Sequence, residues 1–477
     1  MSSPILTIAR AEARLHLRRR AWAVLLGLFA VLLLTAAVLN QVRQSRERAQ
    51  QAAYQDLVRA QWEGQPDRHP HRVAHYGTFA FKSPGPLAAL DPGVDAYAGR
   101  IQFLEAHRQN AANFAEASQL SSAFRLGELT PAFVLQAVLP LLLVVLGFQA
   151  MTGERESGRL RLLASAGLPL RTIALGKALG LATAAAPFLA LGALTGLVQL
   201  GLDPAAPLAQ PGGTARAMLF AVAVLAHTLA WIVFIIAVSG RLARSAPAGA
   251  VLLVAWLATV VVLPRAAAAA ADALHPLPDK TSFAAAVTAE VRAQGDSHDP
   301  NDEHFRELRE RMLAEHGVDR VEDLPVNYGA IVMAEGEKLS AETFARHLAA
   351  LGRTQNAQAA VVDGVAWVAP YLAARRLSTA AAGTDLTAQL AFQREAEAFR
   401  YEFVQELNTL QRDKIVYGGD PDQRLSADHW SRFADFRATP PALADSLRGT
   451  AVAWSALLAW IAVPFLVLLR PAPPSAS

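Results

Sequence analysis

Three histidines, His69, His71 and His75, lie close together in a polar part of the sequence. Two carboxylates, Asp67 and Asp91, lie near them. Imidazole and carboxylate groups are ligands that suit zinc or copper. However, the spacing matches no closed metal motif, and we expect His69-Pro70-His71 to form a flexible loop. We therefore predict no metal site in this chain and keep the three histidines only as weak candidates.

A second polar segment, Asp296–His304, is rich in side-chain oxygen atoms. It lacks the glycine and the terminal glutamate of a calcium-binding loop. We therefore expect a solvated turn that caps a helix beginning at Glu303.

The motifs of common catalytic sites are missing. Gly167 and Gly176-Lys177 are wrongly spaced for the phosphate-binding Gly-x-x-x-x-Gly-Lys-Ser/Thr loop. No His-Glu-x-x-His or Gly-x-Ser-x-Gly sequence occurs, and cysteine is absent, which excludes disulfides and thiolate chemistry. We predict that the chain is not an enzyme, carries no cofactor and cannot hydrolyse ATP by itself.

The most informative charged segment is Thr152–Leu163, which lies between two apolar runs, Phe133–Met151 and Ile173–Leu200. A bilayer core about 30 Å thick needs about 20 apolar residues per helix, and both runs are long enough. Two carboxylates and a leucine stripe at helical spacing predict a short helix outside the bilayer, available to a partner. Arginines mark this face as cytoplasmic. They are Arg155, Arg159, Arg161 and Arg171.

The composition is that of a membrane protein. Of 477 residues, 53% are hydrophobic and only 18% are charged. The formal net charge of +3 does not indicate nucleic-acid binding, because the arginines gather beside apolar spans and no basic run is interleaved with aromatic residues.

Hydropathy divides the chain into six spans and the segments between them. We expect a cytoplasmic amphipathic helix at 1–20, periplasmic insertions at 41–129 and 265–447, a cytoplasmic loop at 152–172 and a disordered tail at 470–477. With an even number of spans, every short arginine-bearing loop and both termini are cytoplasmic, and both insertions lie outside. The predicted spans are 21–40, 131–151, 173–200, 215–239, 246–264 and 449–469.

The first span has an alternative interpretation as a cleaved signal peptide, because Arg18-Arg19-Arg20 resembles an n-region and Thr35-Ala36-Ala37 a cleavage site. Its apolar run exceeds the about 7–15 residues of an h-region, so we favour a retained anchor. The second span should begin at Thr130-Pro131, an N-cap followed by proline. Pro140 predicts a kink within it.

Two glycine pairs, Gly176/Gly180 and Gly192/Gly196, lie in the third span. Glycines four residues apart allow close helix packing, and the pairs lie about 120° apart around the helix, so they should contact different neighbours. An alanine- and glycine-rich helix without a specific interface is the alternative. Lys177 should snorkel to the cytoplasmic interface, where it would anchor the helix or contact an ATPase.

His227 lies near the middle of the fourth span, where ionisable groups are functional candidates. No acidic partner appears in any span, so we favour a neutral imidazole hydrogen-bonded across the bundle.

The insertions should be mainly helical, and the fold class is an all-α polytopic membrane protein. One helix should begin after Thr384-Asp385, with Glu397 and Arg400 on its wetter side, and another should run from Asp95 to about Phe124. Strand signals occur only at Val361-Val362 and around Phe79.

The charged segment, followed by Gly176-Lys177, resembles the export-type ABC transporter permeases with six membrane helices. In that family this loop carries a coupling helix that docks on a separate ATPase subunit. An ordinary arginine-rich cytoplasmic loop is the alternative. The resemblance marks as coupling residues Glu154, Arg155, Glu156, Gly158, Arg159, Leu160, Leu163 and Lys177.

A further resemblance covers most of the chain and points to a bacterial subgroup with large periplasmic insertions, similar to the permease of nitrous oxide reductase maturation. The segments that carry it are His75–Gly77, Leu90–Gly93, Leu104–His107, Leu324–Asn327 and Ser378–Asp385.

This resemblance implies the membrane subunit of an exporter in the bacterial inner membrane. Its partners would be a cytosolic ATPase that binds ATP and magnesium, a second permease copy or paralogue, the lipid bilayer and a periplasmic protein. The cargo is not implied. The alternatives are a membrane-anchored periplasmic receptor or assembly scaffold, and an ion-driven carrier, which should show intramembrane carboxylates and an internal repeat that the sequence lacks.

Overall fold

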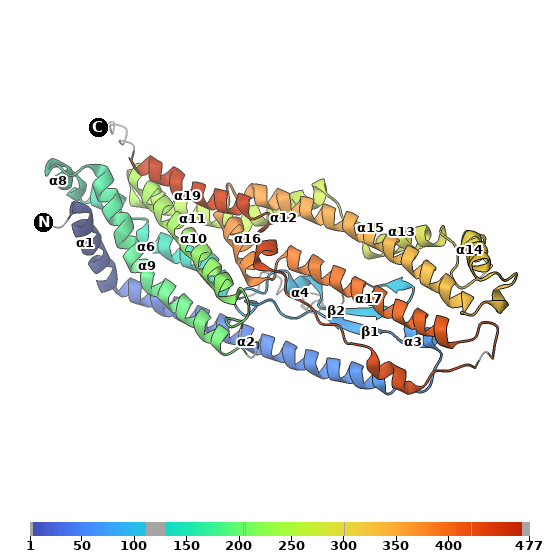
Figure 1. Ribbon diagram of the computed structural model, residues 1–477. Helices are drawn as coiled ribbons and strands as arrows, with labels where there is room; N and C mark the ends of the chain where they lie inside the picture. Colours follow the sequence, from blue (N-terminus) through green and yellow to red (C-terminus); the bar gives the residue numbers. More distant parts are fainter. Residues whose placement is uncertain are drawn as a thin grey trace.

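The computed structural model describes residues 3–110, 129–203, 205, 207–299, 301–420 and 422–469. The molecule is elongated, with α1 (Pro4–Arg18) at one end and α14 (Arg306–His316) at the other (Figure 1). The prediction of an all-α fold is confirmed, since one small sheet of three strands is the only sheet among the described residues. The predicted tail at 470–477 lies outside them, as does the segment 111–128.

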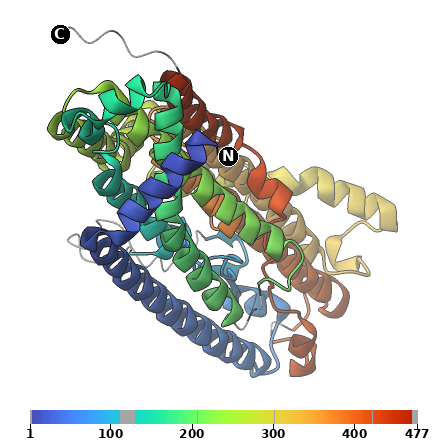
Figure 2. The same cartoon turned by 90° about the vertical axis from the view of Figure 1, so that its left-hand side faces the viewer.

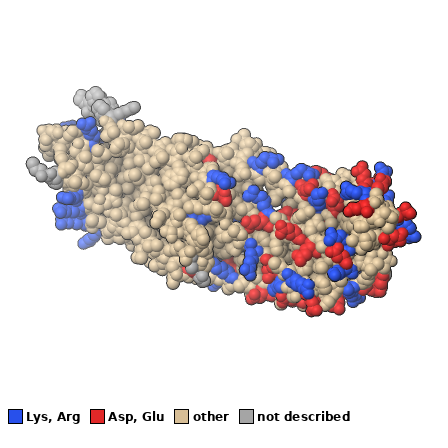
Figure 3. Space-filling view, viewed as in Figure 1, with Lys and Arg blue, Asp and Glu red and all other residues tan. Residues whose placement is uncertain are grey.

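Six helices among the described residues are long and apolar enough to cross a membrane, and each overlaps one of the six predicted spans. The surface around them carries few charged side chains (Figure 3). Lys and Arg gather at the far left of that view, whereas both signs of charge cover the right-hand half. The six helices run over Arg20–Glu63, Pro131–Glu156, Leu170–Gly201, Gly213–Arg241, Ser245–Leu274 and Ala451–Leu469.

The first span and the start of the first insertion are one helix, α2 (Arg20–Glu63). The predicted boundary at residue 40 is therefore no break in the backbone. Arg19, in an extended conformation, separates α2 from α1. The helix ends at Glu63, with Gly64 as its C-cap.

Two spans contain a π-helical turn that ends two residues before a proline. The turn η3 (Val134–Val138) precedes Pro140, and η4 (Ala258–Val262) precedes Pro264. Pro264, expected to close the fifth span, does not end its helix, because the helix continues to Leu274. The boundary of the span at 264 stays a prediction. A wider turn accommodates the proline ring and the missing N–H, so the helix need not stop. The flanking helices are α5 (Pro131–Phe133), α6 (Leu139–Gly147), α11 (Ser245–Leu257) and α12 (Leu263–Leu274).

The helix α10 (Gly213–Arg241) packs against most of the other spans. Its neighbours include α6, α9 (Leu170–Gly201) and α19 (Ala451–Leu469). A helix of the second insertion, α16 (Pro370–Ala382), also packs on α10 and α19, which joins the outer part to the spans.

The first insertion continues after α2 with a small antiparallel sheet. The strand β1, predicted around Phe79, is confirmed, and it pairs with β2, which pairs with β3. The predicted helix from Asp95 is wrong beyond Ala98, because residues 101–105 alternate in burial and pair as a strand. The elements are α3 (Pro70–Tyr76), β1 (Thr78–Phe81), α4 (Asp95–Ala98), β2 (Ile101–Glu105) and β3 (Arg108–Gln109).

The second insertion is built on two long helices, α15 (Tyr328–Val365) and α17 (Leu386–Lys414), which lie side by side (Figure 1). The predicted strand at Val361-Val362 is wrong, because both residues lie within α15. Asp385 caps α17 as expected. The remaining elements are α13 (Lys280–Arg292), η5 (Glu303–Phe305), α14, η6 (Val321–Asp323), η7 (Ala427–Arg432) and α18 (Leu443–Leu447).

The two insertions share one hydrophobic core. Trp62 and Val73 of the first pack with Phe403 and Trp430 of the second. The indole N–H of Trp62 donates to the carbonyl oxygen of Trp430 at 2.7 Å. The two insertions thus form a single unit that lies outside the six spans, rather than two separate domains. We call it the outer unit.

Candidate functional site

The predicted cytoplasmic loop folds as two short helices, α7 (Thr152–Glu156) and α8 (Arg159–Ser165). Gly158, with a φ of 76°, forms the turn between them, where a residue with a Cβ would be strained. Both helices lie at the same end of the molecule as α1 (Figure 1). We call this pair the α7–α8 loop.

A buried ionic network lies between the α7–α8 loop and two neighbouring helices. The ammonium group of Lys177, on α9, lies 2.6 Å from Glu12 Oε2 on α1 and 2.6 Å from Glu154 Oε1 on α7. The other oxygen of Glu154 accepts from Arg159 Nε at 2.7 Å. Lys177 is only 5% exposed, so the expectation that it snorkels or contacts a partner directly is wrong. Its two carboxylate partners hold it inside the protein.

The same loop is attached to two further helices by hydrogen bonds. Arg155 donates to the carbonyl oxygens of Gly240 and Leu242 at the end of α10. Glu156 accepts from the backbone N–H and the hydroxyl of Ser245, both at 2.7 Å, at the start of α11. A cation at a helix C-terminus and an anion at an N-terminus are both favourable.

The α1 helix crosses α9 at the first glycine pair (Figure 2). A Cβ built on Gly180 would lie 2.4 Å from the Cβ of Glu12, and one on Gly176 would lie 2.6 Å from the Cβ of Ile8. The second pair has other neighbours, since Gly192 faces Leu135 and Gly196 faces Leu90. The first pair therefore allows the close approach that brings Glu12 to Lys177.

Replacing Gly180 with valine is expected to detach α1 from α9. The added side chain would overlap Glu12, and neither helix backbone can move without breaking the ion pair with Lys177. We expect a loss of about 1–3 kcal/mol, typical of overpacking, and faster proteolysis of the N-terminal helix. Gly27→Val is the matched control, because nothing lies within 4 Å of a Cβ there. Equal protease resistance of the two variants would contradict the expectation.

Part of the α7–α8 loop faces solvent and could meet a partner. Leu160 is buried in the hydrophobic core and Leu163 packs against it. In contrast, Leu162 is 70% exposed, and two exposed arginines, Arg159 and Arg161, precede it in the same short helix. The exposed face therefore presents one apolar side chain together with two cations.

His227 is fully buried in the bundle and bonds across it. Its Nε2 lies 2.9 Å from the carbonyl oxygen of Gln136 in η3. That carbonyl is the one a residue at position 140 would bond in a regular helix, and Pro140 has no N–H to offer. His227 therefore supplies a hydrogen bond that the proline removes, which agrees with the favoured structural role.

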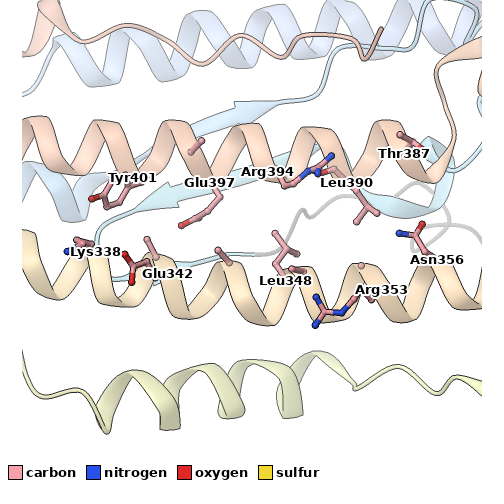
Figure 4. Close-up of a pocket in the computed structure, with 15 residues that line it drawn as sticks. Lys338, Glu342, Leu348, Arg353, Asn356, Thr387, Leu390, Arg394, Glu397 and Tyr401 are labelled. Carbon is pink, nitrogen blue, oxygen red and sulfur yellow. The ribbon is translucent and has the colours of Figure 1, made fainter. Parts of the chain in front are cut away.

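The outer unit contains a groove of about 730 Å³ between α15 and α17 (Figure 4). Leu348 and Leu390 line its apolar part, and Glu342 and Arg353 lie along α15. Glu397 also lines it and points toward α15 in Figure 4.

A buried ion triad lies beneath this groove. Arg400 Nη2 lies 2.7 Å from Glu397, and its Nη1 lies 2.6 Å from Glu337 on α15. Both Arg400 and Glu337 are 0% exposed, so the prediction that Glu397 and Arg400 lie on the wetter side of the helix is wrong. Burial raises the pKa of the Glu397 carboxyl despite its bond to Arg400. The triad joins α15 and α17.

Four histidines come together at the far end of the outer unit. Their ligating nitrogen atoms all lie within 4.8 Å of one another. His69 is not among them, because its ring accepts the N–H of His71 and caps α3. The expected flexible loop there is in fact the start of this helix. The four are His71 and His75 on α3, His107 between β2 and β3, and His298 after α13.

Burial and the neighbouring imidazoles lower the pKa of three of these rings, those of His71, His75 and His107. Burial, together with His75 and His298, lowers the pKa of His71 to about 4. Burial, together with His298, His71 and His75, lowers the pKa of His107 to about 3. Sequence spacing identified His71 and His75 but missed His107 and His298, as it missed Glu12. Each of the missed residues is far from its partners in the sequence.

Comparison with known proteins gives one family match. Residues 281–439 match a family described as "Domain of unknown function (DUF3526)". The match begins in α13 and extends past η7, so it covers most of the second insertion and includes His298, Glu337 and Arg400. No curated protein matches the chain.

Proposed function

We propose that this chain is the membrane subunit, or permease, of an ABC exporter in a bacterial inner membrane, and that a separate cytosolic ATPase drives it. The observation that carries the proposal is the α7–α8 loop, which combines an exposed face with attachments to α1, α9, α10 and α11. A loop with only a topogenic role needs arginines but not these attachments.

The charge distribution supports a cytoplasmic position for this loop and for both termini. Lys and Arg gather at this end of the molecule, whereas the outer unit carries both signs of charge (Figure 3). Short arginine-rich loops remain on the cytoplasmic side of a membrane. The outer unit then lies in the periplasm.

Force applied to α8 has a defined route into the spans. It passes from Glu154 through Lys177 to α9 and α1, and from Glu156 to α11. The helix α10 receives it through Arg155 and is packed against α16 of the outer unit. Closure of the ATPase would therefore tilt several spans together and move the unit that contains the groove.

We also propose that the permease pairs with a second copy of itself or with a paralogue. The apolar windows of α2, the α11–α12 span and α19 are each only 22% buried within one chain. Their free faces are available to lipid and to a second copy.

Leu162→Asp tests the contact with the ATPase. The permease is recovered from its own host in mild detergent, and any ABC ATPase subunit that co-purifies is measured. We expect wild type to retain the ATPase, and the variant to lose at least about 90% of it, because a charge replaces the exposed apolar side chain at the contact. Val416→Asp is the control, because Val416 is 69% exposed but lies in the outer unit. Wild type that recovers no ATPase, or equal recovery with Leu162→Asp, would favour a membrane-anchored receptor or scaffold.

A further inference from the structure

The outer unit brings four imidazole rings together, with their ligating nitrogen atoms all within 4.8 Å of one another. We propose that it holds one borderline transition-metal ion, Zn²⁺ or Cu²⁺, bound by a nitrogen atom from each of four histidines: His71, His75, His107 and His298. This inference does not depend on the proposed transport function.

The four nitrogen donors favour Zn²⁺ and Cu²⁺ over other metal ions. Four nitrogen donors without carboxylate oxygens disfavour Ca²⁺ and Mg²⁺, which require oxygen ligands. The chain has no cysteine, so no thiolate favours Cu⁺ or an iron–sulfur cluster. Neutral imidazole is a preferred ligand of both Zn²⁺ and Cu²⁺.

The side chains are already close to ligand geometry. A tetrahedral ion with bonds of about 2.0–2.1 Å keeps its ligand nitrogens about 3.3–3.4 Å apart. The Nε2 atoms of His71 and His75, four residues apart on one face of α3, lie 3.2 Å from each other. His107 Nε2 is buried and has no hydrogen-bond partner. A bound ion would satisfy this nitrogen, and the set needs only a small contraction around it.

The backbone at His107 is held in an unusual conformation. His107 is the only non-glycine with a positive φ among the described residues, at 58°. It lies in the tight turn between β2 and β3, beside Ala106, whose N–H donates to Ala74 of α3 at 3.1 Å. Strained backbone of this kind concentrates at functional sites. Here it places the His107 ring beside the two histidines of α3.

A carboxylate lies beside the Nδ1 atom of two of the rings. Glu337 Oε2 accepts the backbone N–H of His107 at 3.0 Å and lies 3.5 Å from its Nδ1. Asp296 Oδ1 lies 3.3 Å from Nδ1 of His298. Metal-binding histidines commonly place their second ring N–H beside a carboxylate. The arrangement leaves Nε2 of each ring for the ion.

The position of His298 depends on a close approach of its loop to α15. A Cβ built on Gly336 would lie 2.2 Å from the Cβ of Ser297. Asp302 fixes the same loop by accepting the N–H of Asp296 at 2.9 Å. Gly336 thus allows His298 to reach a cluster whose other members belong to the first insertion.

The ion would serve a structural role. Four protein ligands complete a tetrahedral shell and leave no open position for a reacting water. Three ligands come from the first insertion and one from the second. The ion therefore ties together two segments that are far apart in the sequence.

Metal binding to the full-length protein tests this inference. The protein, purified with a tag that contains no histidine, is stripped with chelator and loaded separately with Zn²⁺ and Cu²⁺. We expect about one ion per chain by elemental analysis and a higher unfolding temperature, because the ion binds only the folded state. Co²⁺ should give the visible absorption of a tetrahedral nitrogen site. The spectrum of Cu²⁺ and competition between Zn²⁺ and Cu²⁺ decide which ion is preferred.

The variants His75→Ala and His298→Ala remove exposed ligands and should leave the fold intact. Each should weaken binding by more than about 100-fold, and Asp296→Asn by about 10-fold. His316→Ala, an exposed histidine outside the cluster, should bind as wild type does. The inference is overturned if wild type retains neither ion, if Ca²⁺ or Mg²⁺ stabilises it equally, or if the double variant His75→Ala/His298→Ala binds as well as His316→Ala.

Discussion

Replacing Lys177 with methionine should destabilise the protein by about 3–5 kcal/mol, because the buried carboxylate of Glu12 loses its ammonium partner and Glu154 keeps only Arg159. The side chains of Lys177 and Glu12 are 6% and 7% exposed, so water cannot replace the lost charge. Repulsion between Glu12 and Glu154 should then release α1 from α9 and loosen the α7–α8 loop. Thermal unfolding in detergent and proteolysis of the N-terminal helix measure the two effects.

The triple variant Lys177→Met/Glu12→Gln/Glu154→Gln distinguishes the effect of unpaired buried charge from the effect of altered packing. It removes all three charges and keeps most of the volume, so much of the stability should return. Lys338→Met, at a lysine that is 48% exposed, should change stability by less than about 0.5 kcal/mol. A Lys177→Met variant that unfolds at the wild-type temperature would show that the carboxylates do not need their cation.

Replacing Arg400 with methionine should have an effect of similar size in the outer unit. Glu337 and Glu397 would remain buried beside each other without a countercharge, at a cost of about 3–5 kcal/mol. Glu337 also orients His107, so the four-histidine cluster should be disturbed as well. We expect a lower unfolding temperature and weaker retention of Zn²⁺.

Arg394→Met provides the comparison, because Arg394 lies on the same helix, faces the groove and is exposed. Its stability should stay within about 0.5 kcal/mol of wild type. If the two arginine variants unfolded alike, the triad would have no stabilising role.

The spans and the main helix starts could be predicted because their signals are local. Twenty apolar residues specify a span wherever they occur, and Thr130 and Asp385 cap helices through contacts only three residues away. The sequence could not predict whether the helix ends at Pro264 or continues past it. A proline can end a helix or follow a π turn, and packing decides which of the two occurs.

The polar sites depend on contacts between distant parts of the chain. Glu12 meets Lys177 only because α1 crosses α9 at two glycines, and this crossing is not encoded beside either charge. Likewise, His298 reaches His107 only after the two insertions have formed a common core. The periodicity of α17 placed Arg400 toward water, but its partner Glu337 lies on another helix. Buried charges of this kind are invisible to a hydropathy pattern.

The 44-residue helix α2 has a mechanical consequence. At 1.5 Å per residue the helix is about 66 Å long, and it is unbroken at residue 40, where the predicted membrane span ends. Its inner end meets α1 at Arg19, and near its outer end Trp62 is fixed in the core of the outer unit. Pivoting by about 10° at the inner end would swing the far end by about 11 Å. A small change in the tilt of α2 among the spans would thus produce a large displacement of the outer unit, because the helix acts as a rigid lever.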